Sequence, residues 1–103
     1  MGLVPEDESM IGCECVGHVK RLGPGVTKFS MGDRVAVMRN GTYANRVQCP
    51  VRRAHSIPAW MSFTDAATIP LVYATALYGL YHLANLREGQ VRWTGDIVRA
   101  KLY

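Results

Sequence analysis

Residues 12–35 read GCECVGHVKRLGPGVTKFSMGDRV, and this stretch decides the fold. Its glycines recur at short intervals, at positions 12, 17, 23, 25 and 32. A glycine can adopt positive φ, and it lets two backbones approach closely where a side chain would clash. Extended stretches lie between the glycines, and Gly23-Pro24-Gly25 marks a sharp corner. The spacing therefore predicts a tightly wound, small β-barrel.

The next stretch contains a strong local turn signal. Asn40-Gly41 separates two extended runs, over 33–39 and 42–49. Residues of these two types favour the positive φ angles that a type I′ hairpin turn requires. We therefore expect a hairpin in which Met38 faces Tyr43.

The second half changes from extended to helical patterning. A last extended segment is expected over 53–57, and Ser62 is a good N-cap for the first helix. Asp65, three residues later, completes a shortened version of the capping box. Pro70 disfavours helix at the residue before it, so we expect a break there and a second helix over 71–84.

Composition favours one small packed domain over a disordered chain. The 103 residues are 49 % hydrophobic and 19 % charged, which is enough apolar material for a core. The net charge is +4, but the twelve basic residues are scattered along the chain. A nucleic-acid partner would need a stripe or cluster of them, so none is expected.

The character of the first residues, the uncharged stretch and the cysteines together favour a cytoplasmic protein. The first nine residues are acidic and lack the apolar run of a secretory signal. The uncharged stretch 66–86 is interrupted by Pro70, Gly79, His82 and Asn85, so we expect a buried helix and no membrane span. The three cysteines have no disulfide-framework spacing, which favours a reducing compartment.

Four blocks of sequence together resemble the N-terminal, GroES-like catalytic domain of the medium-chain dehydrogenase/reductase superfamily. Two of them match the family patterns Gly-x-Glu-x-x-Gly-x-Val and Gly-x-x-Val-x-x-Phe-x-x-Gly-Asp-Arg-Val, at Gly12, Glu14, Gly17, Val19, Gly23, Val26, Phe29, Gly32, Asp33, Arg34 and Val35. The others are Gly41-Thr-Tyr-Ala44, which leads to Cys49-Pro50, and Ala66-Ala-Thr-Ile-Pro70, followed by Thr75-Ala76. Their shared order over residues 9–90 makes the match specific. Glu14-Cys15 and the lack of a zinc lobe are most similar to enoyl reductase domains of fungal highly reducing polyketide synthases.

The resemblance implies NADPH-dependent reduction of an enoyl thioester in the parent family. In that family a glycine-rich Rossmann turn follows shortly after the position of Gly89, whereas no Gly-x-Gly-x-x-Gly occurs in this sequence. The expected fold is therefore mainly β with C-terminal helices, a GroES-like, partly open β-barrel truncated before the Rossmann domain. Its expected parts are a lead-in (1–9), the barrel portion (10–61), a helical connection toward the missing cofactor domain (62–90) and a divergent tail (91–103).

Two functions remain open for such a chain. The first is a fragment of an NADPH-dependent enoyl reductase that is inactive alone and does not bind NADPH tightly. The second is a non-catalytic interaction module that docks on a synthase or a related reductase.

One residue is a candidate for cofactor contact, and no residue is assigned a catalytic role. In quinone-reductase-like relatives the Thr that matches Thr75 lies beside the nicotinamide, so the resemblance implies cofactor binding by Thr75. The alternative is a mid-helix threonine that bonds the carbonyl one turn back, and both remain open.

The run Cys13-Glu14-Cys15 invites a zinc interpretation, with His18, His55 or Cys49 as further ligands. The chain has no Cys-x-x-Cys pair, however. Strand alternation places Cys13 and Cys15 on one face and Glu14 on the other. We therefore predict no metal site, with small apolar core cysteines and a Glu14 that binds backbone donors or Arg34.

Overall fold

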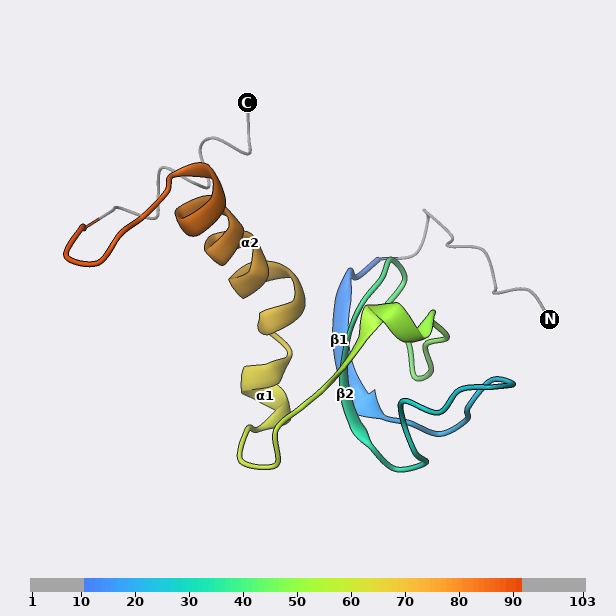
Figure 1. The fold of residues 1–103 in the computed structure, drawn as a ribbon. Helices are drawn as coiled ribbons and strands as arrows, with labels where there is room; N and C mark the ends of the chain where they lie inside the picture. The colour runs from blue at the N-terminus through green and yellow to red at the C-terminus, as the bar shows by residue number, and fades with distance from the viewer. Residues whose placement is uncertain (1–10, 92–103) are drawn as a thin grey trace. The chain divides into compact units, whose positions relative to one another are not determined.

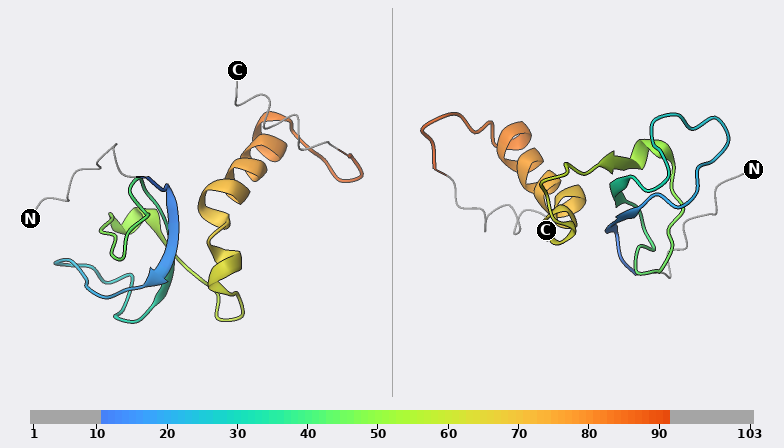
Figure 2. Two further views of the ribbon diagram at one scale, coloured as in Figure 1. Left: turned by 180° about the vertical axis from the view of Figure 1, so that it is seen from behind. Right: turned by 90° about the horizontal axis from the view of Figure 1, so that it is seen from below.

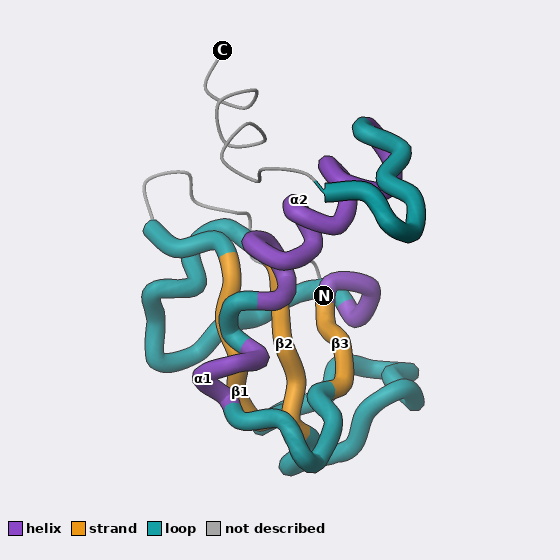
Figure 3. The backbone as a smooth tube through the Cα atoms, turned by 90° about the vertical axis from the view of Figure 1, so that its left-hand side faces the viewer, coloured by secondary structure: helices purple, strands orange, loops and turns teal. Residues whose placement is uncertain are grey.

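A three-stranded antiparallel sheet organises the first half of the chain (Figure 1). The computed structural model describes residues 11–91. Strand β1 spans Glu14–His18, β2 spans Arg34–Met38, and β3 spans Ala54–Ser56. The strands lie in the order β1-β2-β3, so β2 is central (Figure 3). The chain divides into two compact units between Leu71 and Val72, and the sheet belongs to the first.

Pairing between β1 and β2 continues past the ends of both strands. Glu14 lies opposite Met38 in the register. Beyond the other end of the pair, the Val19 N–H donates to the Asp33 carbonyl at 2.8 Å, and the Gly32 N–H donates to the Val19 carbonyl, also at 2.8 Å. These two hydrogen bonds join the beginning and the end of the connection between the strands, which is drawn in cyan in Figure 2.

Glycines make the corners of this connection, as the spacing predicts. Gly25 has φ +74° and Gly32 has φ +88°, in the left-handed region where other side chains are strained. The Val26 N–H donates to the Gly23 carbonyl at 3.3 Å across the first corner.

Each face of the sheet contacts its own apolar cluster, because successive side chains on a strand alternate. One cluster contains the buried residues Phe29, Val35, Val37 and Ala54. The other contains Ala36, Ile57 and Ala66, with Val16, Met61 and Phe63 packed against it. The predicted fold class, a partial GroES-like barrel with helices toward the C-terminus, is confirmed.

The predicted Asn40-Gly41 hairpin is wrong. Gly41 has φ +80°, but among the described non-glycine residues only Asn85 has positive φ. The Thr42 N–H donates to the Gly12 carbonyl at 3.3 Å, and the Tyr43 N–H donates to the Ile11 carbonyl at 3.1 Å. Met38 lies opposite Glu14, and Tyr43 is 78 % exposed. Strand β2 already has partners on both edges, so residues 42–49 cannot join it.

The first helix begins where the sequence predicts. Helix α1 spans Phe63–Ala66, and its N-cap is Ser62. The Asp65 N–H donates to Ser62 Oγ at 3.1 Å, and Ser62 Oγ donates to Asp65 Oδ2 at 2.9 Å. The cap thus satisfies one of the backbone N–H groups that a first helical turn leaves without a partner.

The predicted break before Pro70 is also confirmed, and helical turns resume at Ile69, two residues earlier than expected. The resumed run consists of a π-helical turn, η2 (Ile69–Tyr73), then α2 (Ala74–Leu77), then a second π-helical segment, η3 (Tyr78–Leu83). Proline is favoured in the first turn of a helix, because its missing N–H has no intrahelical partner to lose there.

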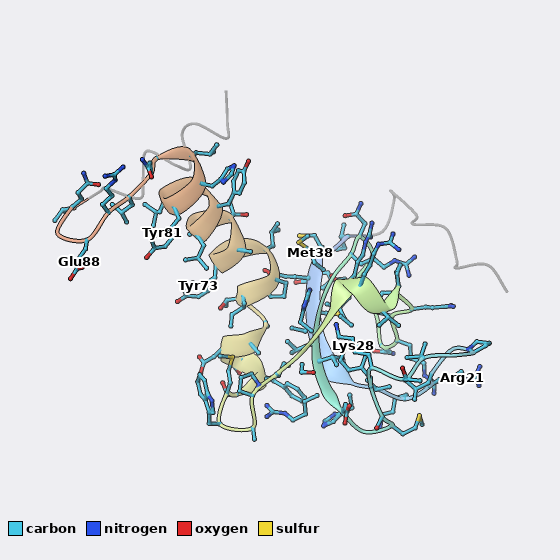
Figure 4. The ribbon with its side chains drawn as sticks, viewed as in Figure 1. Arg21, Lys28, Met38, Tyr73, Tyr81 and Glu88 are labelled. Atoms are coloured by element: carbon cyan, nitrogen blue, oxygen red, sulfur yellow. The ribbon has the colours of Figure 1, made fainter. Side chains whose placement is uncertain are left out.

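The expected burial of this helix is not observed. Tyr73, Tyr78 and Tyr81 are each more than half exposed, and Figure 4 shows Tyr73 and Tyr81 on the helical run. The described part of the second unit is this run and the turns after it, and a helix cannot bury all its own faces. No helix within residues 11–91 has the length and apolarity to cross a membrane.

Arg34 holds the loop before α1 against the sheet. Its Nη2 donates to the Met61 carbonyl at 2.6 Å, and its Nη1 donates to the carbonyls of Pro58 and Ala59 at 3.3 Å. The guanidinium carbon lies 4.6 Å from the centre of the Phe63 ring. Asp33, by contrast, accepts from the Ser30 N–H at 2.9 Å.

Replacing this arginine should therefore destabilise the fold. We expect Arg34→Met to lower the free energy of unfolding by about 2 kcal/mol, because carbonyls lose a charged donor while the aliphatic stem is kept. Urea-induced unfolding measures this change. Arg21→Met removes an exposed arginine as the matched control, and equal effects of the two substitutions would contradict the role of Arg34.

Candidate functional site

Glu14 joins β1 to the start of the second helical run. Its Oε2 accepts a hydrogen bond from the Leu71 N–H at 2.8 Å, and the contact is half-buried. Leu71 lies in the first turn of that run, where N–H groups have no partner within the helix. A carboxylate there also compensates the partial positive charge of the helix start. Glu14 therefore binds a backbone donor, as the sequence predicts.

The alternative partner predicted for Glu14 was Arg34. The hydrogen bonds described for Arg34 lead instead to the carbonyls of Pro58, Ala59 and Met61. The loop before α1 thus presents three carbonyl acceptors, and one guanidinium has enough N–H donors to bond all of them.

Thr75 lies four residues after Leu71, one helical turn further along the chain. It belongs to α2, and its side chain is half-buried. The bond from Leu71 to Glu14 thus fixes the turn immediately before the one that carries Thr75. A contact between Thr75 and a cofactor stays a prediction.

A dinucleotide does not fit the residues that the structure describes. Binding of a pyrophosphate in this class of fold depends on a glycine-rich turn that opens directly into a helix. The described glycines with positive φ are Gly12, Gly25, Gly32, Gly41 and Gly89. None of these glycines stands directly before a helix of the described chain. Residues 11–91 therefore contain no glycine-rich turn that could hold the pyrophosphate.

The three cysteines occupy two kinds of environment. Cys15 and Cys49 are half-buried and pack against the first apolar cluster, so the prediction of core cysteines is confirmed for these two. Cys13 is exposed, and for it the prediction is wrong. Cys13 directly precedes Glu14, the first residue of β1.

Burial and nearby charge both change the pKa values of the two half-buried thiols. Burial raises the pKa of Cys15 above its ordinary value of 9.0, and the neighbouring Cys49 adds to the rise. Burial also raises the pKa of Cys49, while the Arg39 guanidinium acts in the opposite direction. Both thiols are therefore neutral at pH 7. Within residues 11–91, His, Cys, Asp and Glu side chains form no group of three that could hold a metal ion. The absence of zinc stays a prediction.

The sequence interpretation missed Arg39, whose side chain is only 9 % exposed. A signal for it was present, because Arg39 follows Val35 and Val37 at the spacing of one strand face. Arginine is rarely buried without a partner, so an arginine on the face of two core valines indicates a buried polar contact.

Comparison with known proteins gives the family. Residues 2–75 match the family model described as the alcohol dehydrogenase GroES-like domain. Because this match covers most of the chain, the protein belongs to that family, within the medium-chain dehydrogenase/reductase superfamily. The crystal structure of the human synaptic vesicle membrane protein VAT-1 homolog-like protein is 41 % identical and superposes with a TM-score of 0.72. That match covers 77 % of this chain and 26 % of the other.

Reducing polyketide synthases are similar in sequence. A highly reducing polyketide synthase of Penicillium crustosum is 49 % identical over 90 residues, which is 87 % of this chain and 4 % of the synthase. Another from Arthrinium phaeospermum is 43 % identical over 93 residues, again 87 % of this chain and 4 % of the synthase. The chain thus spans a small part of these relatives, and the predicted resemblance to polyketide synthases is confirmed.

The contact between Glu14 and Leu71 can be tested directly. We expect Glu14→Ala to lower the free energy of unfolding by about 2 kcal/mol, because a half-buried N–H loses a charged acceptor. Glu14→Gln should cost about half as much, since an amide oxygen still accepts a hydrogen bond. Urea unfolding gives both values, and amide hydrogen exchange should become faster at Leu71.

Glu88→Ala is the matched control, because Glu88 is an exposed acid of the second unit. It should change the free energy of unfolding by less than about 0.5 kcal/mol. Unchanged exchange at Leu71 in Glu14→Ala would show that the carboxylate does not hold this N–H group.

Proposed function

We propose that this chain supplies part of the GroES-like portion of an NADPH-dependent enoyl reductase of the polyketide-synthase type. In such a reaction a hydride goes to the β-carbon of an enoyl thioester and a proton goes to the α-carbon. The observation that carries the proposal is the 49 % identity over 90 residues to a highly reducing polyketide synthase. A partial barrel of the same superfamily, with Thr75 on the helix that follows it, supports the proposal.

In the complete reductase, we assign Thr75 to the cofactor and Glu14 to the support of Thr75. The Thr75 hydroxyl would bond the nicotinamide ring or ribose. Glu14 would hold the preceding helical turn through the Leu71 N–H. These two roles concern binding and orientation, and no residue of this chain is assigned to proton transfer.

The chain alone should not carry out the reaction. A hydrogen bond from Thr75 contributes about 0.5–1.5 kcal/mol. Micromolar binding of a nucleotide corresponds to roughly 8 kcal/mol. Without a phosphate cradle in residues 11–91, this difference has no source there. By the same proposal the protein acts in the cytoplasm, where its thiols stay reduced.

A second candidate function is a non-catalytic module that docks on a synthase or a related reductase. The observation that favours it is the exposed apolar surface of the second helical run, which includes Val72, Tyr73, Leu77, Tyr78, Tyr81 and Leu83. Exposed aromatic and aliphatic side chains in this number are typical of an interaction surface.

Titration of the isolated chain with NADPH tests the expectation that the chain alone neither binds the nucleotide tightly nor carries out the reaction. We expect no saturable binding in the micromolar range, measured by nucleotide fluorescence, and no turnover of a crotonyl thioester above the blank. A micromolar Kd would mean that the chain holds a phosphate site that its described residues lack.

A chimera tests whether this chain can act as part of an enoyl reductase and whether Thr75 contacts the cofactor. The 90 matching residues of the Penicillium crustosum synthase would be replaced by those of this chain. The chimera should retain enoyl reduction, and Thr75→Val in it should lower kcat/KM for NADPH about 2- to 10-fold, the value of one hydrogen bond. Thr75→Ser keeps the hydroxyl and should restore most of the loss.

Thr64→Val, at an exposed position of α1, is the matched control and should leave kcat/KM unchanged. An inactive but folded chimera would favour the docking module over the reductase fragment. An active chimera that is insensitive to Thr75→Val would remove Thr75 from the cofactor site.

A further inference from the structure

One face of the sheet brings sulfur and positive charge together. Cys15 lies opposite Val37 in the register of β1 and β2. The pairing continues one step further, because the Arg39 N–H donates to the Cys13 carbonyl at 3.0 Å. Residues two apart on a strand share a face, so Arg39 lies on the face of Val37 and Cys15. The burial of Arg39, 9 % exposed, agrees with this placement.

Cys49 reaches the same face from a segment far along the chain. Cys15 and Cys49 both pack against the cluster of Phe29, Val35, Val37 and Ala54. A charge on Cys49 raises the pKa of Cys15, and the Arg39 guanidinium lowers the pKa of Cys49, which agrees with this shared placement. Both cysteines are free thiols. Two thiols and a buried guanidinium therefore gather over one apolar cluster.

We propose that Cys15 and Cys49 form a dithiol site that hydrogen peroxide converts to an intrachain disulfide. Two thiols that are held together by a packed core react with each other far more readily than with a second molecule, because their effective concentration is high. Cys13 is exposed, unlike the other two cysteines, and we assign it no part in this site.

Cys49 is the attacking sulfur, because the Arg39 guanidinium favours its thiolate. The Cys49 thiolate bonds to one oxygen of the peroxide, the O–O bond breaks, and hydroxide leaves. The Cys15 thiolate then attacks the sulfur of the resulting sulfenic acid, and a second hydroxide leaves. The two hydroxides take up the two thiol protons. One peroxide and two thiols thus become one disulfide and two waters, with each sulfur oxidised by one electron.

The test uses the full chain with Cys13→Ser, because Cys13 and Cys15 share the tryptic peptide 1–20, while Cys49 lies in 47–52. After treatment with hydrogen peroxide, the intact monomer should lose two hydrogens. Trypsin without reductant should then release peptide 1–20 joined to 47–52, and dithiothreitol should separate them. Because burial raises the pKa of both thiols, the rate should rise about tenfold per pH unit between pH 7 and 9, with the fraction of thiolate.

Cys15→Ser is the matched control, since it leaves Cys13 and Cys49 in the same two peptides. It should yield at least tenfold less of the joined peptides. Comparable yields from the two variants would overturn the proposal. Sulfinic or sulfonic acids on separate peptides of the Cys13→Ser chain, or disulfides formed only between chains, would also overturn it. The Cys13→Ser result decides the question even if Cys15→Ser does not fold, because Cys13 is exposed.

Discussion

The position of β2 at the centre of the sheet is the constraint on which the rest of the first unit depends. With β1 on one edge and β3 on the other, both edges of β2 are occupied, and no further strand can lie beside it. The stretch after Gly41 must therefore bond elsewhere, and it does so with the carbonyls of Ile11 and Gly12. The same central strand carries Arg34 on one face and Val35 and Val37 on the other.

Strand alternation separates two chemical roles on adjacent residues of β1. Glu14 faces the side on which the second helical run begins, and it holds the Leu71 N–H there. Cys15 faces the opposite side, where it meets the core cluster together with Cys49. Neighbouring residues in the sequence thus serve different faces, so neither side chain competes with the other for space or for partners.

The first unit and the second differ in how far their apolar side chains are buried. In the first unit each face of a small sheet contacts a buried cluster. In the second, the described helical run leaves several large side chains exposed. A chain that spans 4 % of its polyketide synthase relatives is a natural place for such surface, since in a longer protein neighbouring segments can cover it. The docking alternative rests on this exposed surface, whereas the reductase proposal rests on the sequence identity to the synthases.

The sequence by itself determined the family, the glycine corners at Gly25 and Gly32, the Ser62 cap and the break before Pro70. Each of these depends on the conformational preference of one or two residues, or on a motif with fixed spacing. The tertiary structure decided which segments pair and which side chains meet. The Asn40-Gly41 signal predicted a hairpin that the occupied edges of β2 exclude. Contacts such as Glu14 with Leu71, or Cys15 with Cys49, join residues far apart in the chain, and no local pattern specifies them.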